Sequence, residues 1–178
     1  MTRLEKVRAE VRRIGEDHAA GGGPGIEYGI ADLVAALHYC GFRTTGSCEG
    51  HHDATKRMYP WVILTATNTQ FPIILRTLDQ KVAFEPVKQR WKSESKALKD
   101  LISRFNHGDD QHKYPRDENL CLIGEDKSGA MLAPVGAKLL DKFPRELITQ
   151  EQCESILCRY QGLMKRFAEF LIRHEDKK

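Results

Sequence analysis

The chain of 178 residues lacks any hydrophobic run long enough to span a bilayer, so we expect no membrane partner. Its N-terminal stretch is charged throughout and contains no apolar segment, which predicts that there is no secretory signal. The five cysteines have neither the even number nor the paired spacing of a disulfide framework or a double Cys-x-x-Cys zinc site. We therefore expect a cytoplasmic protein with reduced cysteines.

The sequence also lacks a strong charge imbalance, because 28 basic and 25 acidic residues leave a net charge of only +3. This excess does not predict nucleic-acid binding by the chain as a whole, although local basic patches are compatible with it. No internal repeat is visible, and the only biased segment is a glycine run at 21–25. The length suits one domain that buries about two-thirds of the surface of the unfolded chain.

The apolar pattern predicts an α+β (mixed α/β) fold, with helices packed on a sheet of four or five strands in a single domain over 1–178. Helices are predicted at 2–18, 29–40, 67–78, 93–108 and 149–175, with a short one from Gly136. Strands are predicted at 42–47, 61–66, 120–123 and 130–135, with an edge or bent strand at 82–91 around Pro86. The glycine-rich stretch 21–25 is expected to be a joint.

Reactive side chains are concentrated in residues 43–53, Arg-Thr-Thr-Gly-Ser-Cys-Glu-Gly-His-His-Asp. Cys48 lies just beyond the end of a predicted strand, where open α/β sheets place ligands. The candidate catalytic residues are Cys48, His51, Glu49, His52 and Asp53. The candidate ligand-binding residues are Thr45, Ser47, Gly50, Arg43 and Trp61. We expect a Cys/His active or metal site in the loop 46–53.

Two interpretations of this loop stay open. In the first, Cys48 is a nucleophile with His51 as its base, and the amides of residues 49–51 converge as an anion-binding nest, with Gly50 at a positive φ. A cysteine needs neighbouring positive charge, amides or a metal to become a thiolate near neutral pH. In the second, the glycines form a simple turn and Cys48 is a small buried hydrophobic residue.

Metal binding is a further hypothesis, because Cys48-x-x-His51 is a chelating pair suited to zinc. Only one such pair is visible in the sequence. The residues considered for completing the site are His52, Asp53, Cys40, His38, His107, His112 and Cys121. Cys153 and Cys158 are interpreted as packing residues of the C-terminal helix.

Two alternatives concern binding partners rather than catalysis. Arg43, Lys56 and Arg57 can contact the phosphates of a nucleotide or an RNA, and Tyr59 and Trp61 can stack on a base, although Trp61 also begins an apolar strand. The broad apolar face of the helix at 149–175 either packs across the sheet or pairs with another copy as a homo-oligomer.

The segment 41–51, followed by Pro60-Trp61-Val62, resembles a stretch of uncharacterised bacterial and phage proteins in which a helix and a Gly-x-x-Thr strand lead into Ser-Cys-Glu-Gly-His. This resemblance implies that the loop is a site, without naming its chemistry. The segment 44–51 is also similar to Thr-Thr-Ser-Ser-Cys-Ser-Gly-Arg of the tRNA methyltransferases of wybutosine synthesis. It differs at Gly46, Glu49 and His51, where the last change replaces an arginine with a titratable imidazole. That similarity implies an RNA-binding alternative related to tRNA modification.

Overall fold

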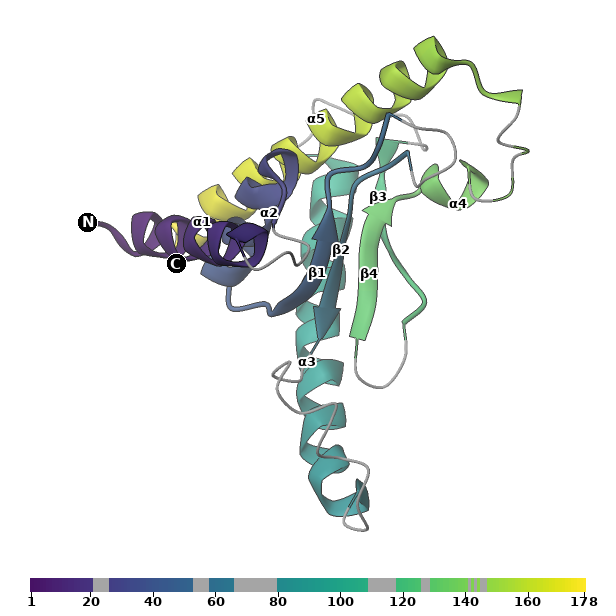
Figure 1. Cartoon of the computed structure of the whole chain (residues 1–178). Helices are drawn as coiled ribbons and strands as arrows, with labels where there is room; N and C mark the ends of the chain where they lie inside the picture. The colour runs from purple at the N-terminus through teal and green to yellow at the C-terminus, as the bar shows by residue number, and fades with distance from the viewer. Residues whose placement is uncertain are drawn as a thin grey trace.

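Four antiparallel strands form the sheet of this computed structural model, in the order β1-β2-β4-β3 (Figure 1). The structure describes residues 1–20, 26–52, 58–65, 80–108, 118–125, 129–140, 142, 144 and 147–178. The strands are β1 (Thr44–Cys48), β2 (Trp61–Thr65), β3 (Leu120–Ile123) and β4 (Gly129–Pro134). The helices are α1 (Arg3–Ala20), α2 (Tyr28–Tyr39), α3 (Gln80–His107), α4 (Ala137–Leu140) and α5 (Gln150–Glu175). The α+β fold predicted from the sequence is therefore confirmed.

The antiparallel register places the end of β1 beside the start of β2, because Cys48 pairs with Trp61. Between Thr44 and Gly46 the register shifts, so Thr45 lies in a bulge of β1. The sheet contains no parallel pair among the described strands. The rule that parallel sheets bind ligands at their carboxyl edge therefore does not account for the place of Cys48, which is the last residue of β1 and not a loop residue beyond it.

Helix α5 lies obliquely over the end of the sheet at which β1 and β2 are joined, and it packs against α2 (Figure 1). Its inward side is apolar along its whole length, and the buried residues are Cys153, Leu157, Tyr160, Leu163, Met164, Phe167, Ala168 and Leu171. Each fully buried leucine contributes about 2 kcal/mol. The apolar face that suggested pairing with another copy thus lies in the core of this chain, and it no longer argues for assembly. Cys158 is exposed, so its prediction as a packing residue is wrong.

Local signals in the sequence define the ends of several helices. Thr2 and Glu5 form a capping box, with Glu5 N–H donating to Thr2 Oγ1 at 3.2 Å and Thr2 N–H to Glu5 Oε2 at 2.6 Å. Thr149 and Gln152 form a second capping box at the start of α5. The long C-terminal helix predicted at 149–175 is confirmed.

The prediction of a strand at 82–91 is wrong, because α3 runs without a break from Gln80 to His107. Its buried positions, Trp91, Ser95, Leu98, Ile102 and Phe105, continue at three- and four-residue steps, so Ser93 lies inside the helix and does not begin it. Adding a residue to an existing helix costs much less than starting a new element, which explains why the segment around Pro86 joins the helix. The predicted helix at 67–78 and the joint at 21–25 lie outside the described residues. No described helix is both long and apolar enough to cross a membrane.

Candidate metal centre

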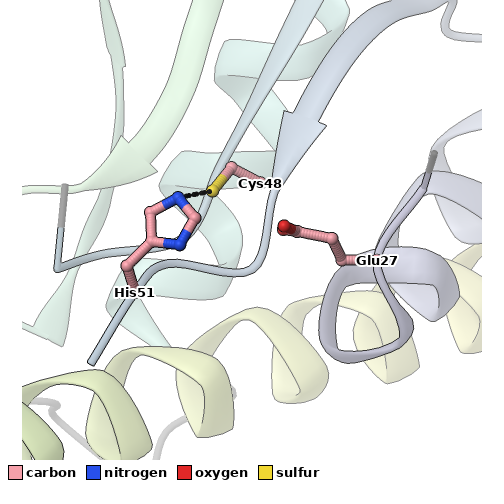
Figure 2. A group of neighbouring side chains, drawn as sticks. All are labelled: Glu27, Cys48 and His51. Atoms are coloured by element: carbon pink, nitrogen blue, oxygen red, sulfur yellow. Dashed lines mark hydrogen bonds between the residues drawn. The ribbon is translucent and has the colours of Figure 1, made fainter. Parts of the chain in front are cut away.

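Three side chains from separate parts of the chain converge at the end of β1 (Figure 2). Cys48 ends the strand, His51 follows it by three residues, and Glu27 is the residue before α2. Their sulfur, nitrogen and oxygen ligand atoms all lie within 4.8 Å of one another, and Cys48 Sγ is 3.4 Å from His51 Nε2. The fold thus brings a thiol, an imidazole and a carboxylate to one point.

The turn after Cys48 depends on Gly50, whose φ of +88° favours glycine. This conformation directs the Gly50 N–H toward Cys48 Sγ, at 3.3 Å. Gly50 is buried, and a Cβ there would overlap the Leu157 side chain and lie 3.0 Å from the Tyr59 carbonyl carbon. The predicted positive φ is confirmed, and the turn brings His51 back over the thiol.

Glu27 and Glu49 join the start of α2 to the end of β1 by two reciprocal hydrogen bonds. The Glu49 N–H donates to Glu27 Oε2 at 2.6 Å, and the Gly29 N–H donates to Glu49 Oε2 at 2.7 Å. The Glu27 side chain makes no capping hydrogen bond to its own helix, so Glu49 caps α2 instead. Gly29 permits this approach, because a Cβ there would be 2.6 Å from Glu49 Oε2.

Burial raises the pKa of the Cys48 thiol, the Glu27 and Glu49 carboxylates raise it further, and the Gly50 N–H only partly opposes them. Without a cation, the thiol is therefore protonated at neutral pH and is a poor nucleophile. Among the described residues, neither Glu27 nor Glu49 forms an ion pair with a lysine or arginine. A bound metal ion would supply that missing positive charge, because a coordinating thiol is deprotonated.

The donor atoms fit a small transition-metal ion. With a Zn–S distance of about 2.3 Å and a Zn–N distance of about 2.0 Å, tetrahedral zinc separates its sulfur and nitrogen ligands by about 3.5 Å. The observed 3.4 Å between Cys48 Sγ and His51 Nε2 matches this separation. A Glu27 carboxylate oxygen lies within 4.8 Å of both of these atoms, so it is the third candidate ligand.

Two of the three amides that were expected to form an anion-binding nest already have other acceptors. Glu49 N–H donates to the Glu27 carboxylate, and Gly50 N–H donates to Cys48 Sγ. No convergent pair of free amides remains at residues 49 and 50 to stabilise an oxyanion. The amides instead hold two of the candidate metal ligands.

Of the other predicted catalytic residues, the two that the structure describes do not join the cluster. Glu49 caps α2, His52 is exposed, and Asp53 lies outside the described residues. Of the predicted ligand-binding residues, Thr45 is exposed in the bulge, and Ser47, Arg43 and Trp61 are half-buried. The Trp61 ring lies over Gly46, so part of its surface packs within the sheet.

The residues proposed to complete a metal site, as far as the structure describes them, also lie outside the cluster. The His38 ring is 2.9 Å from Thr44 Oγ1, Cys40 Sγ donates to the Leu171 carbonyl, and His107 lies at the exposed end of α3. Cys121 lies in β3, paired with Ala133, and His112 is outside the described residues. For RNA contact, Lys56 and Arg57 are also outside these residues, and Tyr59 is buried and cannot stack on a base.

The sequence prediction missed Glu27, which is separated from Cys48 by a helix and a turn. One signal was present: Glu27 lies between the glycine run and the predicted helix at 29–40, at the helix N-cap. Comparison of the chain with protein-family models, curated proteins and solved structures finds no match in any of the three.

Proposed function

We propose that this protein binds a divalent transition-metal ion, with zinc as the first candidate, through Glu27, Cys48 and His51. The observation that supports the proposal is the convergence of the three ligand atoms within 4.8 Å, with a sulfur-to-nitrogen distance of 3.4 Å. The distance between Cys48 Sγ and His51 Nε2 matches the separation of the sulfur and nitrogen ligands of a tetrahedral zinc ion.

The donor set determines which ions fit. Thiolate and imidazole are ligands of zinc and of other late first-row metals, whereas magnesium and calcium prefer a set made only of oxygen atoms. The local charge also favours a cation, because the Glu27 and Glu49 carboxylates lie beside the thiol and no lysine or arginine among the described residues forms an ion pair with either. Binding a dication would compensate this half-buried negative charge.

A centre with three protein ligands resembles catalytic zinc sites, which keep a fourth position for water or substrate. Such an ion acts as a Lewis acid and lowers the pKa of a bound water. The described residues supply three ligands, so this arrangement favours a catalytic role over a structural role. We therefore propose that this site carries out a metal-dependent reaction. Its substrate is to be identified by experiment.

Zinc binding is tested on protein that has been stripped with a chelator and dialysed against zinc. We expect a single tightly bound zinc ion per chain, measured by elemental analysis and by competition with a chromophoric chelator. Cys48→Ser and His51→Ala should each weaken zinc binding by about 100-fold or more, because each removes a direct ligand.

The matched control is Cys40→Ser, which removes a half-buried thiol at the opposite end of α2. It should keep the zinc content and affinity of the unchanged chain. Equal zinc affinity in Cys48→Ser and the unchanged protein would contradict the proposal, as would a chain that takes up no metal.

A further inference from the structure

Helix α5 presents three residues, each one turn apart, to three consecutive residues of the loop that carries the candidate ligands. Gln161 Nε2 donates to the Glu49 carbonyl at 3.0 Å. Leu157 packs against the α-carbon of Gly50. Cys153 Sγ donates to the His51 carbonyl at 3.6 Å. The spacing of four residues places all three side chains on one face of α5.

Each loop residue held by α5 is in turn joined to a candidate metal ligand. The peptide N–H of Glu49 holds the Glu27 carboxylate, at 2.6 Å. The N–H of Gly50 points at Cys48 Sγ, at 3.3 Å. The third residue, His51, is itself a ligand, with its ring 3.4 Å from the same sulfur. The three residues of α5 therefore support the three ligands through one short stretch of backbone.

We propose that Gln161 is a positioning residue of this centre, which fixes the Glu49 peptide and, through it, the carboxylate of Glu27. This inference rests on the metal site proposed above. Groups that orient metal ligands are needed for full affinity, and their loss typically weakens metal binding by about 10-fold to 100-fold. Gln161 acts on the ligand through a backbone peptide and touches no metal.

Gln161 makes the stronger of the two polar contacts from α5 to residues 49–51. Its amide nitrogen is an ordinary donor at 3.0 Å, whereas the thiol of Cys153 is a weak donor at 3.6 Å. The glutamine also lies, half-buried, among the apolar residues that face the core, between Tyr160 and Leu163. A polar side chain in that position is explained by the carbonyl of Glu49, which it satisfies.

The test compares Gln161→Met, which keeps the length of the side chain without a donor, with Gln161→Lys, which restores an N–H donor. We expect Gln161→Met to bind zinc about tenfold more weakly or worse, and Gln161→Lys to regain part of that loss. Gln150→Met is the matched control, because Gln150 lies on the same helix and bonds only to Glu154. It should bind zinc as the unchanged chain does.

Cobalt provides a readout that a purely structural role of Gln161 would not change. In cobalt-loaded protein, the thiolate-to-cobalt and ligand-field absorption bands report the geometry of the ion. The spectrum should shift in Gln161→Met and return toward that of the unchanged chain in Gln161→Lys. If the zinc affinity and the cobalt spectrum of Gln161→Met equal those of the unchanged chain, the positioning role is overturned.

A failure of the metal site itself is distinguishable. If the unchanged chain binds neither zinc nor cobalt, the proposed function fails. Amide hydrogen exchange at Gly50 and His51 in the metal-free chain then tests whether Gln161 holds the loop. Faster exchange in Gln161→Met than in Gln150→Met supports a role in holding the loop. Equal exchange overturns it.

Discussion

The two ends of α2 carry the same kinds of side chain but organise them differently. At the C-terminal end, His38, Cys40 and Glu175 supply an imidazole, a thiol and a carboxylate, and each interacts with a different group. His38 is 2.9 Å from Thr44 Oγ1, and Cys40 donates to the carbonyl of Leu171. Glu175 forms ion pairs with Arg3 at 3.8 Å and with Lys178 at 2.7 Å.

At the N-terminal end, Glu27, Cys48 and His51 converge on one another, and no basic side chain among the described residues pairs with the carboxylate. The backbone amides of Glu49 and Gly50 take the place of charged partners. The difference shows that composition alone does not determine whether such side chains converge. At the N-terminal end of α2 the donor atoms converge and no lysine or arginine among the described residues pairs with the carboxylate, and this distinguishes it from the C-terminal end.

The glycines at the two ends also differ, although both have a positive φ. Gly41 has a φ of +86° and follows α2, where its N–H donates to His38 O and the next N–H to Leu37 O. It has open space around it, because no atom lies within 4 Å of a Cβ placed there. Gly50 has a φ of +88° but lies against Leu157 and Tyr59. Gly41 is required only for its positive φ. Gly50 is required both for its positive φ and for the close packing of Leu157 and Tyr59.

The largest effect on stability is therefore expected for Gly50→Ala. It combines backbone strain with overlap of Leu157, which predicts a loss of about 3 kcal/mol in the free energy of unfolding. Gly41→Ala carries the backbone strain alone and should cost about 1 kcal/mol. Urea unfolding of the two metal-free variants measures both losses. Equal losses would show that overlap with Leu157 does not contribute to the loss of unfolding free energy in Gly50→Ala.

A smaller effect is expected for Glu49→Ala, which removes the cap of α2 at Gly29. The orphaned N–H predicts a loss of about 1 kcal/mol, and Glu49→Gln, which keeps an acceptor, should lose only about 0.5 kcal/mol. Glu10→Ala is the control, because it breaks only an exposed ion pair with Arg13 and should change stability less. If the two Glu49 variants unfold at the urea concentration of the unchanged chain, Glu49 is not the cap.

Features with a short sequence range were predictable. The capping boxes at Thr2 and Thr149, the positive φ of Gly50 and the four strands depend on residues close together in the chain. The proximity of the Cys48 and His51 side chains was predictable for the same reason, since the two residues are three positions apart. The resemblance of the segment 41–51 to bacterial and phage proteins stays a prediction.

Features that depend on tertiary packing were not predictable. Glu27 reaches Cys48 only because α2 packs between α5 and β1, which brings the start of the helix to the end of the strand. The amides of residues 49 and 50 were expected to be free because a sequence does not show which side chains will accept from them. Pro86 suggested an edge or bent strand, but α3 continues through it, and the buried positions of this helix from Trp91 to Phe105 follow helical spacing.

The smallest expected effect concerns the thiol at the opposite end of α2. Burial raises the pKa of Cys40 from 9.0 to about 11, and the Glu175 carboxylate adds to the shift. Between these values the unfolded chain loses the thiol proton while the folded chain keeps it, so the unfolded state binds fewer protons and stability falls as pH rises. Cys40→Ala removes this contribution.

The difference in unfolding free energy between the unchanged chain and Cys40→Ala should therefore shrink as the pH rises from 9 to 11. Urea unfolding across that range measures it, and Cys158→Ala, which removes an exposed thiol, is the control. A constant difference would mean that Cys40 ionises equally in both states and that its half-buried position does not keep the thiol protonated. A shrinking difference would show that burial, together with a neighbouring carboxylate, keeps a thiol protonated in this fold. Burial and neighbouring carboxylates also raise the pKa of Cys48, which therefore requires a cation to become a thiolate.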